Sequence, residues 1–203
     1  MEEQNEVLGQ EQVLRESEEQ AEGVVPARDE YGRLIFKWVA RICLMMENRY
    51  DRVDIENLKR EQTPPRLSNA GSFFHTVMYD AGAERPYWQK EDEFRHRWYV
   101  VVRGLAECYA NYNYQKPGGA VLYRAGWTEG LLRDLIESRG DELAMLYLKS
   151  MRAIGKGKAK GNLTEIARLV LYQEEVQYKG ISIEDSVRSR LAKGYAQAEA
   201  QDR

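Results

Sequence analysis

Residues 90–113 read KEDEFRHRWYVVVRGLAECYANYN, and this stretch decides the fold class. Its apolar side chains recur at gaps of four, three, four, three and four residues, at Phe94, Trp98, Val101, Leu105, Cys108 and Tyr112. That spacing places them on one face of an α-helix, where they can be buried together. Three acidic residues, 91–93, lie in the first turn, where the helix dipole stabilises negative charge. The stretch therefore predicts a long amphipathic helix.

The same apolar spacing recurs on both sides of this stretch. Towards the N-terminus it predicts helices that begin near Asp29, over 51–61 and near 68–69. Towards the C-terminus it predicts helices that begin near Thr128, Asp141, Asn162 and Ser182, with the Asn162 helix reaching about residue 178. The Pro-Gly-Gly sequence at 117–119 marks 114–126 as a long loop. Long alternating β-branched runs are missing, which argues against a sandwich or barrel. We expect an all-α protein, a compact bundle of about six to eight helices.

Charge is distributed unevenly along the chain. Residues 1–30 hold ten acidic and two basic side chains and carry −8, so residues 31–203 carry +5 of the chain's total of −3. A mildly basic body can hold a phosphate backbone, although many proteins of this charge never touch one. The Glu- and Gln-rich start cannot bury enough apolar surface to offset the cost of ordering. We expect a disordered acidic N-terminal arm at 1–28, a helical bundle at 29–161 and a C-terminal helical extension at 162–203.

Cysteine usage and hydropathy indicate the compartment. Cys43 and Cys108 are the only cysteines, and each lies within an apolar helical pattern, so we expect buried free thiols. No apolar run is long enough to span a bilayer, and the acidic N-terminus lacks the apolar core of a signal peptide. We therefore expect a cytoplasmic protein with no membrane partner.

The residue pattern does not indicate a reaction centre. His75 and His96 are the only histidines, and neither has a second His or Cys at ligand spacing. The glycine- and lysine-containing segment 155–161 lacks the G-x-x-x-x-G-K-[ST] pattern of a phosphate-binding loop. We expect no catalytic residue, no metal and no cofactor, and hence no enzyme. An enzyme with an unrecognised site is the alternative, and a deep pocket of convergent carboxylates would support it.

Basic residues at helical spacing give the candidate binding site. The segment GKGKAKG at 155–161 reads as a flexible basic loop whose lysines could grip a phosphate backbone without reading its sequence. It follows a stripe of basic residues on one predicted helix, and a second stripe lies on the first helix. The candidate nucleic-acid-binding residues are Lys37, Arg41, Lys149, Arg152, Lys156, Lys158 and Lys160. The alternative is a solvated linker and stripes that only keep the protein soluble.

Aromatic residues flank the predicted 114–126 loop and lie near Lys116 and Arg124. They are Tyr112, Tyr114, Tyr123 and Trp127. Three interpretations remain open: a protein-interface hot spot, packing in the core, or a surface on which bases stack.

Three stretches of the chain resemble the small helical subunit of type III CRISPR effector complexes of the Cmr subtype. The first is Glu30-Tyr31 with the apolar helix through Val39-Ala40. The second is PRLSNAG at 65–71 followed by FFHTV at 73–77, which is similar to the family's entry into a buried helix. The third, 142–154, is similar to its closing helix, so the resemblance spans roughly residues 29–160. The chain departs from the family in its acidic arm, its 155–161 segment and the two helices that follow.

The resemblance implies a non-catalytic structural subunit of a ribonucleoprotein with a role in antiviral defence. Such a subunit holds guide RNA and target RNA through backbone contacts. It also contacts other protein subunits of a multi-subunit complex, which can include copies of itself. The alternative is a helical protein–protein adaptor or scaffold subunit without nucleic-acid binding.

Overall fold

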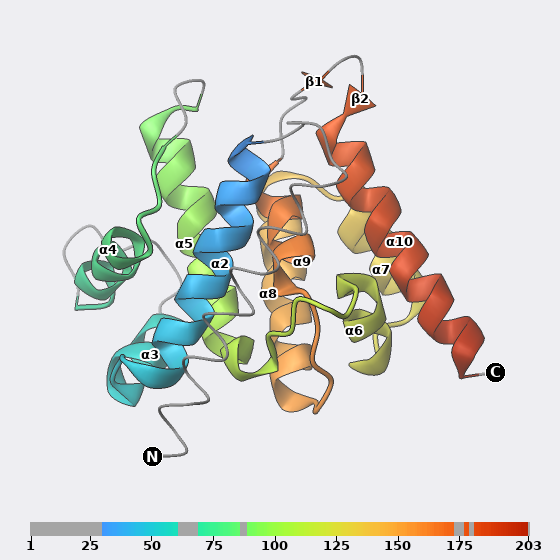
Figure 1. Cartoon of the computed structure of the whole chain (residues 1–203), viewed down its shortest axis with the longest axis horizontal. Coiled ribbons are helices and arrows are strands. Elements are labelled where there is room, and N and C mark those ends of the chain that lie inside the picture. The colour runs from blue at the N-terminus through green and yellow to red at the C-terminus, as the bar shows by residue number, and fades with distance from the viewer. Residues whose placement is uncertain (1–29, 61–68, 86–88, 173–176, 179–180, 203) are drawn as a thin grey trace. The chain divides into compact units, whose positions relative to one another are not determined.

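The structure is a computed structural model that describes residues 30–60, 69–85, 89–172, 177–178 and 181–202. Within these ranges it contains nine α-helices, a short 3₁₀ turn (η1) and one two-stranded hairpin (Figure 1). The elements are α2 (Glu30–Asn48), α3 (Arg52–Arg60), α4 (Asn69–Ala81), α5 (Glu91–Cys108), η1 (Tyr109–Asn111), α6 (Gly118–Arg124), α7 (Glu129–Glu137), α8 (Gly140–Lys156), α9 (Leu163–Leu171), β1 (Gln177–Tyr178), β2 (Ile181–Ser182) and α10 (Ile183–Gln201). The expected all-α helical bundle is confirmed.

Helix α5 is the centre of the core. The face predicted from its apolar spacing is buried, with Trp98 and Leu105 fully enclosed. From Trp98 onwards the other sides of the helix are buried as well, because neighbouring helices enclose this half. Trp38 of α2 packs edge-on against Trp98 with ring centroids 5.7 Å apart, and Phe74 of α4 packs in the same way on Tyr99 at 5.4 Å. Helices α3, α8 and α9 also pack on α5.

Helices α5 and α8 lie side by side and run in the same direction. Tyr147 of α8 packs on Gly104 of α5, and its hydroxyl donates a hydrogen bond to the Val101 carbonyl at 3.2 Å. Two turns further along α8, Gly155 lies against the backbone carbonyl of Glu107. A methyl group at Gly155 would collide with that carbonyl, so glycine permits the two backbones to approach closely. The N-terminal ends of both helices consequently lie at one end of the bundle and the C-terminal ends at the other.

Helix α6 lies inside the segment that was expected to be a loop, and that expectation was wrong. The glycines that suggested a loop serve a packing role instead, because α6 crosses α10 at close range. A side chain at Gly119 would collide with the backbone carbonyl of Leu191. At the start of α6, the Gly118 amide donates to a carboxylate oxygen of Glu165 at 2.6 Å. A carboxylate at a helix N-terminus is stabilised by the helix dipole.

The C-terminal helices belong to the same core as the rest of the bundle. Helix α9 ends at Leu171, earlier than the expected residue 178, and Gln177 and Tyr178 form strand β1. Tyr172 leaves the helix so that its ring packs edge-on against Tyr31 at 5.9 Å. Contacts group residues 31–203 into one compact unit. The expected boundary between 161 and 162 therefore does not coincide with a break in the packing.

Several expectations can be compared directly with the structure. Cys43 and Cys108 are buried and free, as expected. None of the helices among the described residues is long and apolar enough to cross a membrane. The expectation of a disordered arm at 1–28 concerns residues outside the described part of the chain, as does the first half of the family-like stretch at 65–71.

Candidate nucleic-acid interface

The lysine loop, residues 155–161, is held in place by hydrogen bonds. Helix α8 ends at Lys156. The amide of Gly157, the next residue, donates hydrogen bonds to the carbonyls of Ala153 and Ile154. The side-chain amide of Asn111 then donates to two loop carbonyls, those of Gly157 at 3.2 Å and Ala159 at 3.0 Å. The composition predicted a flexible loop, but the structure shows a backbone fixed by a largely buried asparagine.

A neighbouring segment, residues 111–116, runs beside the lysine loop. The Gly161 amide donates to the Asn111 carbonyl at 2.9 Å, and the Asn113 amide donates to the Gly161 carbonyl at 2.9 Å. The Asn162 amide donates to the Lys116 carbonyl at 2.7 Å. These bonds form a parallel bridge between two irregular segments, so that the positions of 111–116 and 157–162 are coupled.

The alternation of burial orients the loop lysines. Lys156, Lys158 and Lys160 are exposed, whereas Gly157 and Ala159 are half-buried. An alternating pattern of this kind is what an extended backbone gives when one side lies against the protein. Lys158 and Lys160 therefore lie on the solvent side of this segment, and Lys156 is exposed at the C-terminal end of α8.

Lys116 adds a fourth cation beside the loop, and sequence reasoning missed it as a member of the site. Its side chain is exposed, and its carbonyl is bonded to Asn162 immediately after the lysine loop. Within the described part of the chain, Lys116 and the three loop lysines form no ion pair within 4.0 Å. A signal for Lys116 could not be read from the sequence, because some forty residues separate it from the loop.

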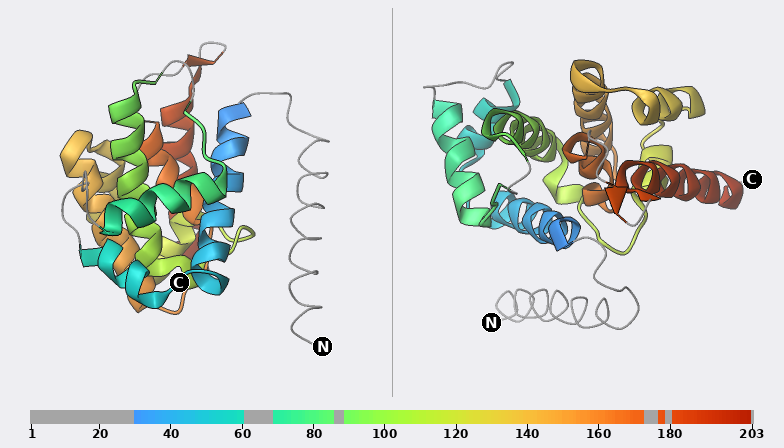
Figure 2. Two further views of the ribbon diagram at one scale, coloured as in Figure 1. Left: turned by 90° about the vertical axis from the view of Figure 1, so that its left-hand side faces the viewer. Right: turned by 90° about the horizontal axis from the view of Figure 1, so that it is seen from above.

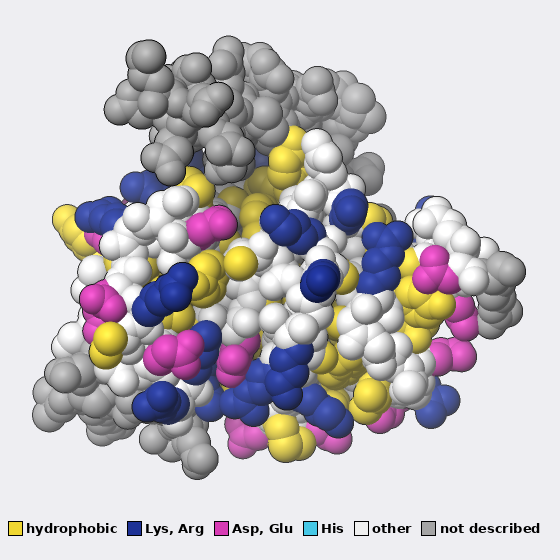
Figure 3. Space-filling model, turned by 90° about the horizontal axis from the view of Figure 1, so that it is seen from below, with side chains coloured by type: hydrophobic (Ala, Val, Ile, Leu, Met, Phe, Trp, Pro, Cys, Tyr) yellow, Lys and Arg dark blue, Asp and Glu magenta, His cyan; other side chains and the backbone are white. Residues whose placement is uncertain are grey.

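The face that lies at the C-terminal ends of α5 and α8 is rich in positive charge. Figure 3 shows Lys and Arg side chains spread across the centre of this face, with acidic groups between some of them. At the opposite ends, α5 and α8 begin with acidic residues, Glu91, Asp92 and Glu93 in one and Asp141 and Glu142 in the other. The acidic first turns of both helices and Lys156 in the last turn of α8 are the charges that the helix dipoles favour, whereas the last turn of α5 has no basic residue.

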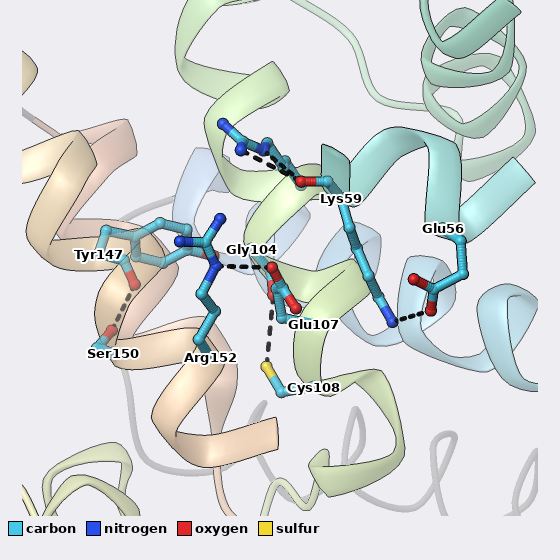
Figure 4. A network of polar contacts seen from close by, with 9 residues as sticks. Glu56, Lys59, Gly104, Glu107, Cys108, Tyr147, Ser150 and Arg152 are labelled. Atoms are coloured by element: carbon cyan, nitrogen blue, oxygen red, sulfur yellow. Dashed lines mark hydrogen bonds and ion pairs between the residues drawn. The ribbon is translucent and has the colours of Figure 1, made fainter. Parts of the chain in front are cut away.

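Arg152 takes part in a contact network that joins three helices. Its guanidinium pairs with the carboxylate of Glu107 at 2.9 Å (Figure 4). Beside this pair, Arg103 donates from two nitrogens to the Lys59 carbonyl of α3, at 3.3 and 3.2 Å. Burial lowers the pKa of Arg103, and the nearby Arg152 charge lowers it further. The Glu107 carboxylate thus partly neutralises the charge of Arg152. The ion pair between them links α8 to α5 beside the contact of α5 with α3.

Arg103 shows where helical spacing misleads. It lies eight residues after Arg95, a spacing that places two residues on roughly the same side of a helix. Arg95 is exposed and pairs with Glu91, but Arg103 is buried beneath α3. The position of a neighbouring helix end decides which of the two turns is covered, and the sequence pattern of α5 does not contain that information.

The remaining candidates lie on helices α8 and α2. Lys149 is exposed one turn before Arg152 on α8. Lys37 and Arg41 are exposed on the outer side of α2, whose other side carries Trp38 into the core. Figures 1 and 2 place α2 and α8 on opposite sides of the bundle. The structure therefore brings together the three loop lysines, with Lys149 and Arg152 preceding them on α8, and separates them from the pair on α2.

The aromatic residues of the 112–127 region differ in their surroundings. Trp127 is buried, and the Tyr112 hydroxyl is enclosed, which raises the pKa of that phenol. Tyr123 packs edge-on against Tyr195 with centroids 5.3 Å apart. Tyr114 is half-exposed, and its hydroxyl accepts a hydrogen bond from the Gln115 side chain at 3.2 Å. The core interpretation thus holds for Trp127, Tyr112 and Tyr123, and Tyr114 remains as a contact candidate.

Other charged groups meet in a surface hollow between α5, α8 and α9. The hollow has a cavity volume of about 370 Å³ and is lined in part by Asp92, Glu93, His96, Arg97 and Asp141. Its carboxylates lie in the first turns of α5 and α8, where the helix dipole accounts for them. Among the described residues, no group of three His, Cys, Asp or Glu side chains could hold a metal ion.

No family model matches the chain, and neither the curated proteins nor the solved structures give a significant match.

Proposed function

We propose that this protein is a non-catalytic structural subunit that binds RNA through its phosphate backbone at the lysine loop. The observation that supports it most is the arrangement of Lys156, Lys158 and Lys160 on a hydrogen-bonded backbone, with Lys116 beside them. Lysine side chains of this kind contact phosphates without reading bases. The charge of +5 on residues 31–203 is consistent with attraction to a polyanion.

The proposal predicts binding that weakens steeply with salt. Three or four phosphate contacts on a single strand give a slope of log K against log salt of about −2 to −3, at about −0.7 per contact. Fluorescence anisotropy with a labelled RNA over a salt series measures this slope. A flat salt dependence, or no binding at low salt, would refute the proposal.

A triple variant identifies the surface that carries the binding. Replacing the three loop lysines by alanine should abolish most of the salt dependence and weaken affinity by roughly tenfold or more at low salt. Replacing them by arginine should preserve both. The matched control removes three exposed cations elsewhere, Lys90, Arg133 and Lys193, and should bind within a few-fold of wild type. Equal losses in the two alanine variants would show a non-specific effect of net charge.

The variant Lys37→Ala/Arg41→Ala tests the second basic stripe. Because α2 and α8 lie on opposite sides of the bundle, one RNA segment bound at the lysine loop does not reach both. We expect this double variant to bind a short RNA with unchanged affinity. A loss as large as that of the loop variant would require a longer binding path around the molecule.

The family resemblance extends the proposal to a specific setting. In that setting the RNA is the guide RNA and the target RNA of a type III CRISPR effector, and the protein contacts further subunits, which can include copies of itself. Purification from the native host tests this. Guide RNA and effector subunits that co-purify would support it, and their absence would restrict the proposal to RNA binding alone.

The adaptor alternative predicts a stable protein partner that survives nuclease treatment. The structure gives it less support, because the large exposed apolar side chains of the described residues, Leu34, Val53, Tyr79 and Met145, lie on four different helices. Single exposed apolar residues are normal on a protein surface, whereas interfaces expose contiguous patches. A partner retained after nuclease treatment, together with no RNA binding, would favour the adaptor.

A further inference from the structure

The tyrosine at position 114 stands next to the lysine loop because of backbone hydrogen bonds. Asn113, which precedes it, donates its amide to Gly161, and Lys116, two residues later, accepts from Asn162. The side-chain oxygen of Asn113 also accepts from the Gln115 amide at 2.9 Å and so fixes the turn. Tyr114 is therefore carried on a segment bonded to the loop on both sides.

The ring of Tyr114 does not pack against the hydrophobic core. Tyr109, Tyr112 and Tyr123 each pack part of the ring against the buried cluster, but Tyr114 does not belong to that set among the described residues. It is half-exposed, and its hydroxyl accepts a hydrogen bond from the Gln115 side chain. A half-exposed aromatic ring beside several unpaired lysines is the combination found on surfaces that bind single-stranded nucleic acids.

We propose that Tyr114 stacks on a base while the lysine loop binds the adjoining phosphates, so that the protein prefers single-stranded RNA to duplex RNA. Alternate residues of an extended backbone are roughly 6–7 Å apart, which is close to the separation of neighbouring phosphates on one strand. The bases of a duplex are stacked on one another and do not offer a face to a tyrosine. This inference rests on the proposed RNA binding at the same loop and adds the strandedness of the ligand.

The experiment compares three probes by fluorescence anisotropy or competition. They are a labelled single-stranded oligouridine, an RNA duplex of equal length, and inorganic polyphosphate, which has the charge but no bases. Tyr114→Ala should weaken binding of the single strand by about fivefold or more, because stacking contributes that much per base. It should leave the affinity for polyphosphate unchanged, since the lysines remain.

Further variants keep the test independent of folding. Tyr114→Phe retains the ring and should bind the single strand within about twofold of wild type. Tyr114→Leu fills similar space without a ring and should behave like Tyr114→Ala. Tyr79→Ala removes a tyrosine that is 87% exposed on α4 and should change nothing. Circular dichroism and thermal unfolding confirm that each variant is folded.

The outcomes separate the two proposals. Unchanged single-strand binding in Tyr114→Ala, or equal losses for oligouridine and polyphosphate, would overturn the stacking role. Wild-type protein that binds duplex as tightly as single strand would also overturn it. If the loop variant loses all three probes while Tyr114→Ala loses none, RNA binding at the loop stands and the strandedness inference fails. If the loop variant loses none, both proposals fail.

Discussion

The substitution Asn111→Ala tests whether the lysine loop is fixed by the asparagine side chain. It removes two hydrogen bonds, to the carbonyls of Gly157 and Ala159, and leaves the backbone bond from Gly161 to the Asn111 carbonyl intact. Each intramolecular hydrogen bond contributes about 0.5–1.5 kcal/mol net, so the loss should be about 2 kcal/mol. For a chain of this size that corresponds to a fall in Tm of roughly 4–8 °C.

Urea unfolding followed by circular dichroism measures the change. The control is Asn113→Ala, which removes one bond to the Gln115 amide in an exposed turn and should cost less than about 1 kcal/mol. RNA affinity of Asn111→Ala should also fall, because the loop lysines lose their common orientation. A variant that unfolds within about 0.5 kcal/mol of wild type and binds RNA equally well would refute the role given to Asn111.

The variant Asn111→Asp tests the same contact through the pH dependence of the stability. A carboxylate only accepts hydrogen bonds, so at neutral pH it would face two carbonyl oxygens without a donor. The loss of stability should then exceed that of Asn111→Ala. Such surroundings favour the neutral acid, which can donate one bond, so the deficit relative to wild type should shrink as the pH falls. A deficit independent of pH would contradict the contact seen at Gly157 and Ala159.

Two further predictions concern the packing of the core. Gly155→Ala should destabilise the protein by about 1–3 kcal/mol in urea unfolding, because the new methyl group meets the Glu107 carbonyl and overpacking outweighs the better helix propensity. The control, Gly130→Ala, meets only a side-chain oxygen 3.9 Å away and should be neutral or stabilising; equal effects of the two would contradict the close contact. Cys43 and Cys108 should resist a thiol reagent in the native state, since burial raises the pKa of both thiols, and rapid native labelling would show that the core opens. Because the folded thiols keep protons that the unfolded ones release, stability should also decline as the pH rises above about 8.5.

The sequence predicts a helix correctly where the apolar spacing within that helix is regular. Helix α5 was found because its apolar spacing is regular and its first turn is acidic. Helix α6 was missed because glycine at 118 and 119 is a local signal for a loop, whereas Gly119 is required by the close passage of α10. That cause lies about seventy residues away along the chain, and no local rule contains it.

The candidate site likewise has features with a local sequence signal and features that depend on distant segments. The three loop lysines were identified from composition, and all three are exposed. Their fixed backbone depends on Asn111, and the fourth cation depends on Lys116, both of which come from a different segment. Glu165 shows the same effect. It follows Asn162 at the three-residue spacing of a capping box, but its carboxylate accepts a hydrogen bond from the Gly118 amide instead.

The main competing explanation for the loop lysines is structural, since cations are stabilised at a helix C-terminus. That effect falls off within the last turn of a helix, and Lys156 is the basic residue in the last turn of α8. Lys158 and Lys160 lie beyond the turn, and Lys116 belongs to another segment. The fold therefore accounts for one of four clustered cations, and their mutual repulsion makes the other three a cost to stability at low salt. The polyanionic ligand proposed for this loop would neutralise those three cations as well as Lys156, and the helix dipole does not account for them.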